Sequence, residues 1–313
     1  MRVAVLSGGR GLERQVSLRS GARVEDALAA LGHEVMAIDV GADLVARLKA
    51  NRPEVAFIAL HGAGGEDGTV QELLEILRIP YTGPGERACV RAFDKVGAKH
   101  DLRTAGVPTP DWAAFNSIAF RELGAAEALE EIEAKLGFPL VIKPASGGSS
   151  LGVRFAATAG EVPAALVGAF SYDDRVLVER HVDGRELAVS LLNGIALPAV
   201  EARPRDEDRF NYEARYEIGR TEYACPAELG AAEGPVLDAA LRTWDALGLE
   251  GCGRVDLILG DDGPQVLEAN AIPGLTDTSL LPMAAEAAGL GFERLCEQLL
   301  ELALEREDRR APV

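Results

Sequence analysis

Long apolar runs and paired cysteines are both missing from this chain of 313 residues. No apolar stretch approaches the ~18 residues needed to span a bilayer, and the apolar core that follows Met1 is too short for a signal peptide. We therefore expect a cytoplasmic protein that does not enter a membrane. The four cysteines form no CxxC pair and have no zinc-like spacing to the four histidines, so we expect buried, reduced thiols.

Lysine is scarce, because only five of the 32 basic residues are lysines and none follows Lys143. A chain that prefers arginine this strongly is expected to keep lysine where a compact ammonium is needed, although coding bias gives the same pattern. Acidic residues dominate, and the net charge is −18. Such a charge repels a phosphate backbone and argues against a nucleic-acid partner. A few local basic residues and a metal ion would still suffice to bind a nucleotide.

The first eighty residues alternate short apolar runs with amphipathic segments. Strands are predicted at 3–6, 34–40 and 55–60, and helices at 17–31, at 44–50 and in the segment that ends at Leu77. Strands separated by helices predict an α/β unit with a parallel sheet, which binds ligands at the carboxyl ends of its strands. The loops that begin at Gly8 and His61 follow two such ends.

Two connectors divide the chain into three predicted domains, 1–85, 86–174 and 175–313. The first is the Pro/Gly-rich segment 79–85 (IPYTGPG), and the second is 172–175. In the middle domain we expect helices at 87–104, 125–136 and 161–170, and strands at 112–115, 139–143 and 152–155. In the last domain we expect strands at 176–182, 186–192, 196–202, 255–259 and 265–269, and helices at 236–247, 280–288 and 292–306. Residues 203–224 have no clear period and are predicted to form a lid or binding loop.

Neither common phosphate-binding motif is present: the glycines after Gly8 fail the GxGxxG pattern, and no GxxxxGK[ST] occurs. The better candidate is the Gly/Ser-rich loop 146–150. Its backbone N–H groups and hydroxyls suit phosphate oxygens, and such a loop can close as a flap. Lys143 ends the preceding strand and would reach the same phosphates. A flexible surface hairpin remains the alternative interpretation.

Two apolar runs near the carboxyl end carry a second group of polar residues. They flank the turn signal 260–264 (GDDGP), which predicts a β-hairpin. With a loop of those five residues, Asp256 faces Glu268 and Arg254 faces Asn270, all on one face. Carboxylate and amide oxygens suit Mg²⁺, and Arg254 suits a phosphate or an oxyanion. The alternative is an ion-pair cluster of Arg254 with either acid.

Seven segments together resemble the ATP-grasp superfamily and, within it, the D-alanine–D-alanine ligase family, over essentially the whole length. They are GGRGLERQVSLRSG (8–21), HGAGGEDGTVQ (61–71), DKVGAK (94–99), IKPASGGSSLG (142–152), NYEARY (211–216), GRVDLIL (253–259) and VLEANAIPGLTDTSLLP (266–282). The resemblance implies a three-domain ATP-grasp architecture with an N-terminal parallel-sheet domain. It also implies that ATP is bound between the central and C-terminal domains.

The resemblance implies a role for each matching position. Glu13 would bind the ammonium of the first D-alanine, with His61 and Ser149 nearby, and Tyr216 would close a lid against Ser149. Ser279 and Leu280 would bind the carboxylate of the second D-alanine. Arg254 and the backbone of Gly274 would stabilise the tetrahedral oxyanion. The alternatives that residue chemistry leaves open are a charge at a helix N-terminus for Glu13, a structural strand-end residue for His61 and a surface aromatic for Tyr216.

The nucleotide site is implied in the same way. Lys95 and Lys143 would hold the ATP phosphates, Glu179 and Val182 would meet adenine, and Glu186 would meet the ribose. Asp256, Glu268 and Asn270 would ligate two Mg²⁺ (or Mn²⁺) ions.

The chain departs from the family pattern at three places. Gly11 stands where Ser is usual, and 146–148 reads Ser-Gly-Gly instead of Arg-Glu-Gly. Arg215 stands where a phosphate-binding Lys is usual, which keeps the charge but changes its geometry. Because Glu13 and the metal ligands are intact, we expect activity.

The expected reaction is ATP-dependent ligation of two D-alanines through an acyl phosphate, for peptidoglycan synthesis, by an enzyme that is usually a homodimer in this family. The alternatives are a depsipeptide ligase that uses D-lactate, a ligase for other amino acids, and a catalytically silent nucleotide-binding paralogue. Tyr216, in place of a lid His, argues against the first, and the intact Lys143, Asp256, Glu268 and Asn270 argue against the last.

Overall fold

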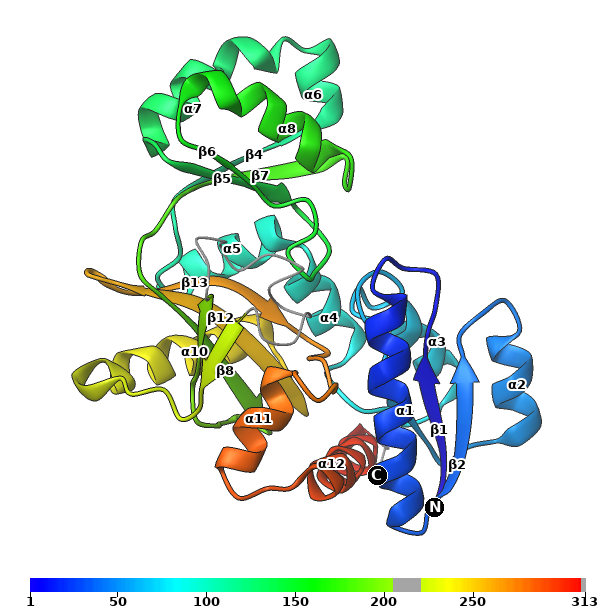
Figure 1. Cartoon of the computed structure of the whole chain (residues 1–313). Coiled ribbons are helices and arrows are strands. Elements are labelled where there is room, and N and C mark those ends of the chain that lie inside the picture. The colour runs from blue at the N-terminus through cyan, green and yellow to red at the C-terminus, as the bar shows by residue number, and fades with distance from the viewer. Residues whose placement is uncertain (205–220, 311–313) are drawn as a thin grey trace.

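The computed structural model describes residues 1–204 and 221–310, which form three β-sheets with helices packed against them (Figure 1). One sheet is parallel and lies in the N-terminal part of the chain. The other two are antiparallel and follow one another along the chain. No helix of these residues is long and apolar enough to cross a membrane. The predicted division at residues 85 and 174 stays a prediction.

The N-terminal sheet has the strand order β2-β1-β3 and is parallel, as the alternation of strands and helices predicts. Its strands and the helices between and after them are β1 (Arg2–Ser7), α1 (Arg14–Ala30), β2 (Glu34–Asp39), α2 (Leu44–Asn51), β3 (Val55–Ile58) and α3 (Thr69–Leu77). The central strand β1 is almost wholly buried because helices cover the sheet. The loops after β1 and β3 leave the same edge of the sheet, which brings residues 8–13 and 59–68 together.

Two short helices, α4 (Glu86–Phe93) and α5 (Lys95–Thr104), replace the single helix predicted over 87–104. The chain is extended at Asp94, and the carboxylate of Asp94 accepts hydrogen bonds from the N–H groups of Val96 and Gly97. Such an N-cap satisfies N–H groups that have no partner within the helix. The break makes Lys95 the first residue of a new helix.

The central sheet is antiparallel, with the order β4-β7-β5-β6. Its strands are β4 (Trp112–Asn116), β5 (Leu140–Pro144), β6 (Arg154–Ala156) and β7 (Arg175–Arg180). Three helices cover one face of it (Figure 1), namely α6 (Ser117–Glu122), α7 (Leu129–Leu136) and α8 (Val162–Phe170). Helix α6 was not predicted, and the helix predicted over 125–136 begins as a 3₁₀ turn, Ala125–Ala128, before α7.

The C-terminal sheet is antiparallel, with β8 and β12 at its centre and β13 at one edge. Its strands are β8 (Arg185–Leu192), β9 (Ile195–Ala196), β10 (Val200–Pro204), β11 (Thr221–Ala224), β12 (Cys252–Gly260) and β13 (Gly263–Asn270). The strand predicted over 196–202 is thus two strands, β9 and β10. Both ends of the predicted loop 203–224 belong to strands, and its middle, 205–220, lies outside the described residues.

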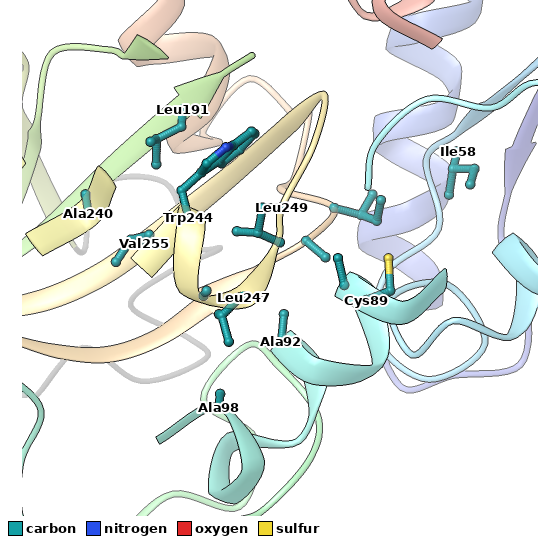
Figure 2. Close-up of a cluster of buried hydrophobic side chains, with 14 of the residues drawn as sticks. Ile58, Cys89, Ala92, Ala98, Leu191, Ala240, Trp244, Leu247, Leu249 and Val255 are labelled. Atoms are coloured by element: carbon teal, nitrogen blue, oxygen red, sulfur yellow. The ribbon is translucent and has the colours of Figure 1, made fainter. Parts of the chain in front are cut away.

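Three further helices complete this part: α10 (Glu233–Leu247), α11 (Leu280–Ala287) and α12 (Phe292–Arg310). Helix α12 returns to pack against α1 and β3 (Figure 1). A hydrophobic cluster also connects the N-terminal sheet to the C-terminal one. Figure 2 shows part of this cluster, with Trp244, Leu247 and Leu249 between the strands of the C-terminal sheet and helix α4. The predicted reduced thiols are found: Cys89, Cys252 and Cys296 are buried and Cys225 is half-buried, all without a disulfide.

The β12–β13 hairpin has the predicted pairing at its polar end but not the predicted turn. Asp256 faces Glu268 and Arg254 faces Asn270, whereas at the other end Gly260 faces Gly263. The turn therefore has two residues instead of five. A bulge beyond Asp256, at Leu267, takes up the extra residue, so the register at the polar end is the one that a five-residue loop would give.

Candidate active site

A cavity of about 440 Å³ lies between the central and C-terminal sheets. Its walls come from strands β5 and β7, from the loop 146–151, and from β8, β12 and β13. Seven of the residues predicted to bind nucleotide or metal line it: Lys95, Lys143, Glu179, Val182, Glu186, Asp256 and Glu268. The predicted site residues of two domains are thus brought to one cavity.

Glu179 lies between two lysines at one wall of this cavity. Its carboxylate oxygens are 2.6 Å from the Nζ of Lys99 and 2.6 Å from the Nζ of Lys143. Burial raises the pKa of the Glu179 carboxyl, but the two ammonium groups outweigh this and hold it below its ordinary value. Burial also lowers the pKa of Lys99 to about 8. A buried anion with two cationic partners stays ionised and fixes where Lys143 points.

Lys99 was not predicted as a site residue. It is buried, and its Nζ also donates to Thr109 Oγ1 and to the carbonyl of Pro110. The spacing of four from Lys95 was a usable signal, because residues at i and i+4 share one face of a helix. The distance between Lys99 and Glu179 could not be predicted from the sequence, because the packing of α5 on the central sheet sets it.

Lys95 connects the flap loop to the hairpin. Its ammonium donates to the carbonyl of Gly147 and lies 3.4 Å from Glu268 Oε2. The start of the loop is tied separately, since the N–H and the hydroxyl of Ser146 both donate to Asp173. The lysine is thus placed between the backbone of the loop and one of the candidate metal ligands.

The hairpin carries two carboxylates and an amide on one face. Arg254 donates to both oxygens of Asp256, at 2.7 and 2.8 Å, and Asn270 Nδ2 donates to Asp256 Oδ2 at 3.1 Å. Two facing carboxylates and an amide oxygen are hard ligands, so the donor set fits a small divalent cation. Both interpretations of the sequence, metal ligands and an ion pair with Arg254, are thus compatible with the arrangement.

A second group of residues lies beside the cavity, around Glu13. Ser149 donates its hydroxyl to Glu13 Oε1, which joins the loop after β1 to the flap loop. Burial raises the pKa of the Glu13 carboxyl, and the charge of Glu66 adds to this effect. A Cβ at Gly62 would collide with the carboxylate, and this residue also has a φ of +69°. Glycine is therefore required there for the carboxylate to fit.

His61 connects this group to the loop after β13. Its Nε2 is 3.0 Å from Ser20 Oγ, its Nδ1 is 3.2 Å from the carbonyl of Ile272, and it is buried. The acidic residue Glu66, which was not predicted, has an oxygen 3.8 Å from Nδ1. Its place in the motif HGAGGEDG, five residues after His61, was the available signal.

The loop 271–279 places Ser279 immediately before helix α11. Ser279 Oγ accepts from the N–H of Thr276 at 3.0 Å and lies 2.8 Å from Thr276 Oγ1. A Cβ at Gly274 would lie 2.7 Å from Ser279 Oγ, so a side chain there would displace the hydroxyl. Leu280 is the first residue of α11, and its N–H group is among those that have no partner within the helix.

Two of the predicted site residues, Arg215 and Tyr216, lie outside the described residues. The others lie in the cavity, on the polar face of the β12–β13 hairpin, around Glu13, and in the loop that leads into α11. The structure shows where these residues lie, and their individual roles stay predictions.

Comparison with known proteins identifies the family. Residues 102–301 match the family model described as the D-ala D-ala ligase C-terminus, and residues 41–84 match the N-terminus. The chain is 43% identical to a D-alanine–D-alanine ligase of Gloeobacter violaceus, covering 97% of this chain and 100% of that protein. It is 46% identical to one of Pseudomonas putida, covering 96% and 92%.

Solved structures agree with the sequence comparison. A D-alanine–D-alanine ligase of Bacillus anthracis superposes with a TM-score of 0.88 at 34% identity, over 99% of this chain and 100% of that one. The same enzyme complexed with ATP gives 0.85 at 32% identity, over 99% and 100%. The three sheets, with a parallel N-terminal one, define the three-domain ATP-grasp architecture, as predicted. Within that class, the chain belongs to the D-alanine–D-alanine ligase family.

Proposed function

We propose that this protein joins two D-alanine molecules into D-alanyl-D-alanine, with conversion of ATP to ADP and phosphate, for peptidoglycan synthesis. The observation that carries the proposal is the cavity in which Lys95, Lys143 and Glu179 meet the Asp256–Glu268 pair. A phosphoryl transfer needs from the protein mainly the positioning of the reactants and positive charge around the phosphates. Identity of 43–46% with curated D-alanine–D-alanine ligases over nearly the whole chain supports the substrate.

ATP is proposed to bind between the central and C-terminal sheets, with Lys95 and Lys143 at its phosphates. Lys143 is held by Glu179 and Lys95 by the carbonyl of Gly147, so both ammonium groups are oriented before the nucleotide arrives. Adenine is assigned to Glu179 and Val182, and the ribose to Glu186. The solved relative complexed with ATP supports a nucleotide in this fold.

Asp256, Glu268 and Asn270 are proposed to hold two Mg²⁺ or Mn²⁺ ions. Such ions supply positive charge that neutralises the oxygens of a transferring phosphoryl group. The side chain of Asp256 already lies against Arg254, which we assign, with the N–H of Gly274, to the oxyanion of the tetrahedral intermediate.

The first D-alanine is proposed to bind with its ammonium near Glu13 and His61, and its carboxylate attacks the γ-phosphoryl group of ATP. The acyl phosphate that forms is easily hydrolysed, so water must be excluded. We assign that task to the loop 146–150, whose Ser149 is bonded to Glu13, together with residues 203–224 and Tyr216. Arg215 is assigned to the phosphates.

The second D-alanine is proposed to bind its carboxylate at Ser279 and the N–H of Leu280. The N-terminus of a helix favours an anion, and Ser279 lies at the N-terminus of α11. The free amine then attacks the acyl phosphate, and collapse of the tetrahedral intermediate releases phosphate. Further parts of the proposal are a cytoplasmic location, a homodimer, and no membrane or nucleic-acid partner, the last supported by the net charge of −18.

The test is phosphate release from the purified chain with ATP and Mg²⁺, and with D-alanine, L-alanine, D-serine or D-lactate as substrate. We expect release with D-alanine and the dipeptide as product. Release only when D-lactate or D-serine accompanies D-alanine would assign a different acceptor. Binding of nucleotide without phosphate release under any condition would indicate a catalytically silent nucleotide-binding paralogue.

A further inference from the structure

Helix α1 carries two residues, one turn apart, that contact the backbone of the loop 271–279. Ser20 Oγ accepts from the N–H of Leu275 at 3.2 Å. Arg23 Nη1 donates to the carbonyl of Leu275 at 3.1 Å and to that of Thr276 at 3.0 Å. Residues at i and i+3 share one face of a helix, so this face of α1 offers both an acceptor and a donor to the same stretch of backbone.

Two more contacts fix the guanidinium of Arg23. It stacks on the ring of Phe292, 3.7 Å from the ring centroid, and its Nε is 3.1 Å from Asp277 Oδ1. The Asp277 side chain is 90% exposed, so this ion pair adds little stability. The stacking and the two carbonyl bonds define the geometry, because a planar fork held at several points has little freedom left.

Thr276 connects Arg23 to Ser279 through hydrogen bonds. Its carbonyl accepts from Arg23, while its N–H and hydroxyl are both bonded to Ser279 Oγ. Arg23 thus acts on the residue that orients the Ser279 hydroxyl and, with it, the start of α11. Glu13 is ten residues earlier, about 15 Å along a helix axis, and Arg23 does not line the nucleotide cavity.

We propose that Arg23 is a positioning residue for the acceptor subsite, which holds the Leu275–Thr276 backbone so that Ser279 and the N-terminus of α11 meet the carboxylate of the second amino acid. The inference rests on the proposed function and deepens it. A substitution of Ser20 would not distinguish the two subsites, because Ser20 also contacts His61 on the side of the first D-alanine. Among the described residues, the hydrogen bonds and the ion pair of Arg23 go to the loop 271–279 and its ring contact is with Phe292, so we expect its effect to be specific to the acceptor.

The test is Arg23→Met, which keeps most of the apolar stem but removes the donors, with Arg19→Met as the matched control. Arg19 is exposed on the same helix. Initial rates measured over a wide range of D-alanine concentrations, at saturating ATP and Mg²⁺, give separate Michaelis constants for the first and the second D-alanine. Arg23→Met should raise the second constant about tenfold, the effect of losing hydrogen bonds from a charged donor. The Michaelis constants for the first D-alanine and for ATP should stay within about twofold of those of the unmodified chain.

Arg23→Lys should recover part of the loss, since an ammonium can still donate to one carbonyl. Amide hydrogen exchange of the full chain without substrates gives a second readout: the N–H groups of Thr276 and Ser279 should exchange faster in Arg23→Met than in Arg19→Met. If Arg23→Met does not fold, Arg23→Lys and Arg23→Gln provide both measurements.

A parallel rise of both D-alanine constants, or a lower melting temperature with unchanged constants, would overturn the inference and leave Arg23 as a clamp between α1 and α12. Failure of the proposed function has a different signature. In that case the unmodified chain releases no phosphate with D-alanine, and the exchange experiment alone decides whether Arg23 orders the loop.

Discussion

Arg254 occupies both carboxylate oxygens of Asp256, through Nε at 2.7 Å and Nη2 at 2.8 Å. Bidentate pairs of this kind are among the stronger hydrogen-bonded ion pairs. A cation that binds Asp256 therefore meets a guanidinium already in place. With Asp256 as a metal ligand, as proposed, we expect metal loading to be coupled to the position of Arg254, and the first two predictions test the two sides of this coupling.

Glu268→Gln should abolish ligation while the fold is retained. The substitution removes the negative charge that helps to neutralise a divalent cation, yet keeps the side-chain volume. Phosphate release and the melting temperature are the measurements, with Asp262→Asn in the turn of the same hairpin as the control. Near-normal activity at saturating Mg²⁺ would sink the assignment of Glu268 as a metal ligand.

Arg254→Met should have opposite effects on metal binding and on ligation. Without a competing positive charge at Asp256, the affinity for Mn²⁺ should rise several-fold, equivalent to roughly 1 kcal/mol for one charge near a protein surface. Ligation should fall, because the proposed oxyanion partner is gone. Titration of Mn²⁺ into the full chain measures the first effect, and a weaker affinity than that of the unmodified chain would contradict the coupling.

Glu66→Gln should move the acid side of the pH profile to lower pH. Burial and then the charge of Glu66 raise the pKa of Glu13, and the proposed role of Glu13 requires the ionised carboxylate. Removing the Glu66 charge lowers the pKa of Glu13, so kcat/KM for D-alanine is retained to a lower pH. The exposed Glu72→Gln on α3 is the control, and an identical profile for both variants would separate Glu66 from the titration.

Lys99→Met should weaken ATP binding and destabilise the chain. It leaves the buried Glu179 with one cation instead of two, and the loss of one partner of a buried ion pair costs up to about 3 kcal/mol. Glu179, which orients Lys143, is then held less firmly, so the Michaelis constant for ATP should rise about tenfold. Addition of Glu179→Gln to Lys99→Met should lower the melting temperature further, because the buried Lys143 then has no carboxylate partner. A double variant at least as stable as Lys99→Met would refute this account.

Glu201 should make stability sensitive to acid. Its hydrogen bond from Arg185 and then that from Arg203 lower the pKa of Glu201 to about 2. The stabilisation is complete above the ordinary pKa near 4.5 and is lost as the pH falls toward 2. Because both arginines are partly exposed, we expect a loss of about 2 kcal/mol over that window. Glu201→Gln should flatten this part of the stability profile, which urea unfolding at several pH values measures.

The β12–β13 hairpin shows how a sequence can predict a site and miss the local geometry. The turn signal 260–264 indicated a hairpin, and the alternation of side chains indicated which residues share a face. The length of the turn was wrong, and a bulge at Leu267 compensated for it. A bulge depends on how the strand packs against its neighbours, so an extra residue within an apolar run cannot be recognised as a bulge from the sequence.

The break at Asp94 was within reach of the sequence, because Asp is a strong N-cap residue, but the helical period on both sides concealed it. The environment of Glu179 was not within reach. Three segments far apart in the chain supply Glu179, Lys99 and Lys143, and only tertiary packing fixes their distances. The same holds for Arg23, whose partners are more than 250 residues away.

The distribution of the five lysines has a consequence for chemical labelling. Lys95 and Lys143 are buried and line the nucleotide cavity, Lys99 is buried without lining it, and Lys49 and Lys135 are exposed. An amine-reactive probe small enough to enter the cavity would find a simple target, because arginine, which supplies nearly all the other positive charge, does not react. Protection of Lys95 and Lys143 by ATP, read by mass spectrometry with Lys49 and Lys135 as internal standards, would report occupancy of the cavity residue by residue in the unmodified chain.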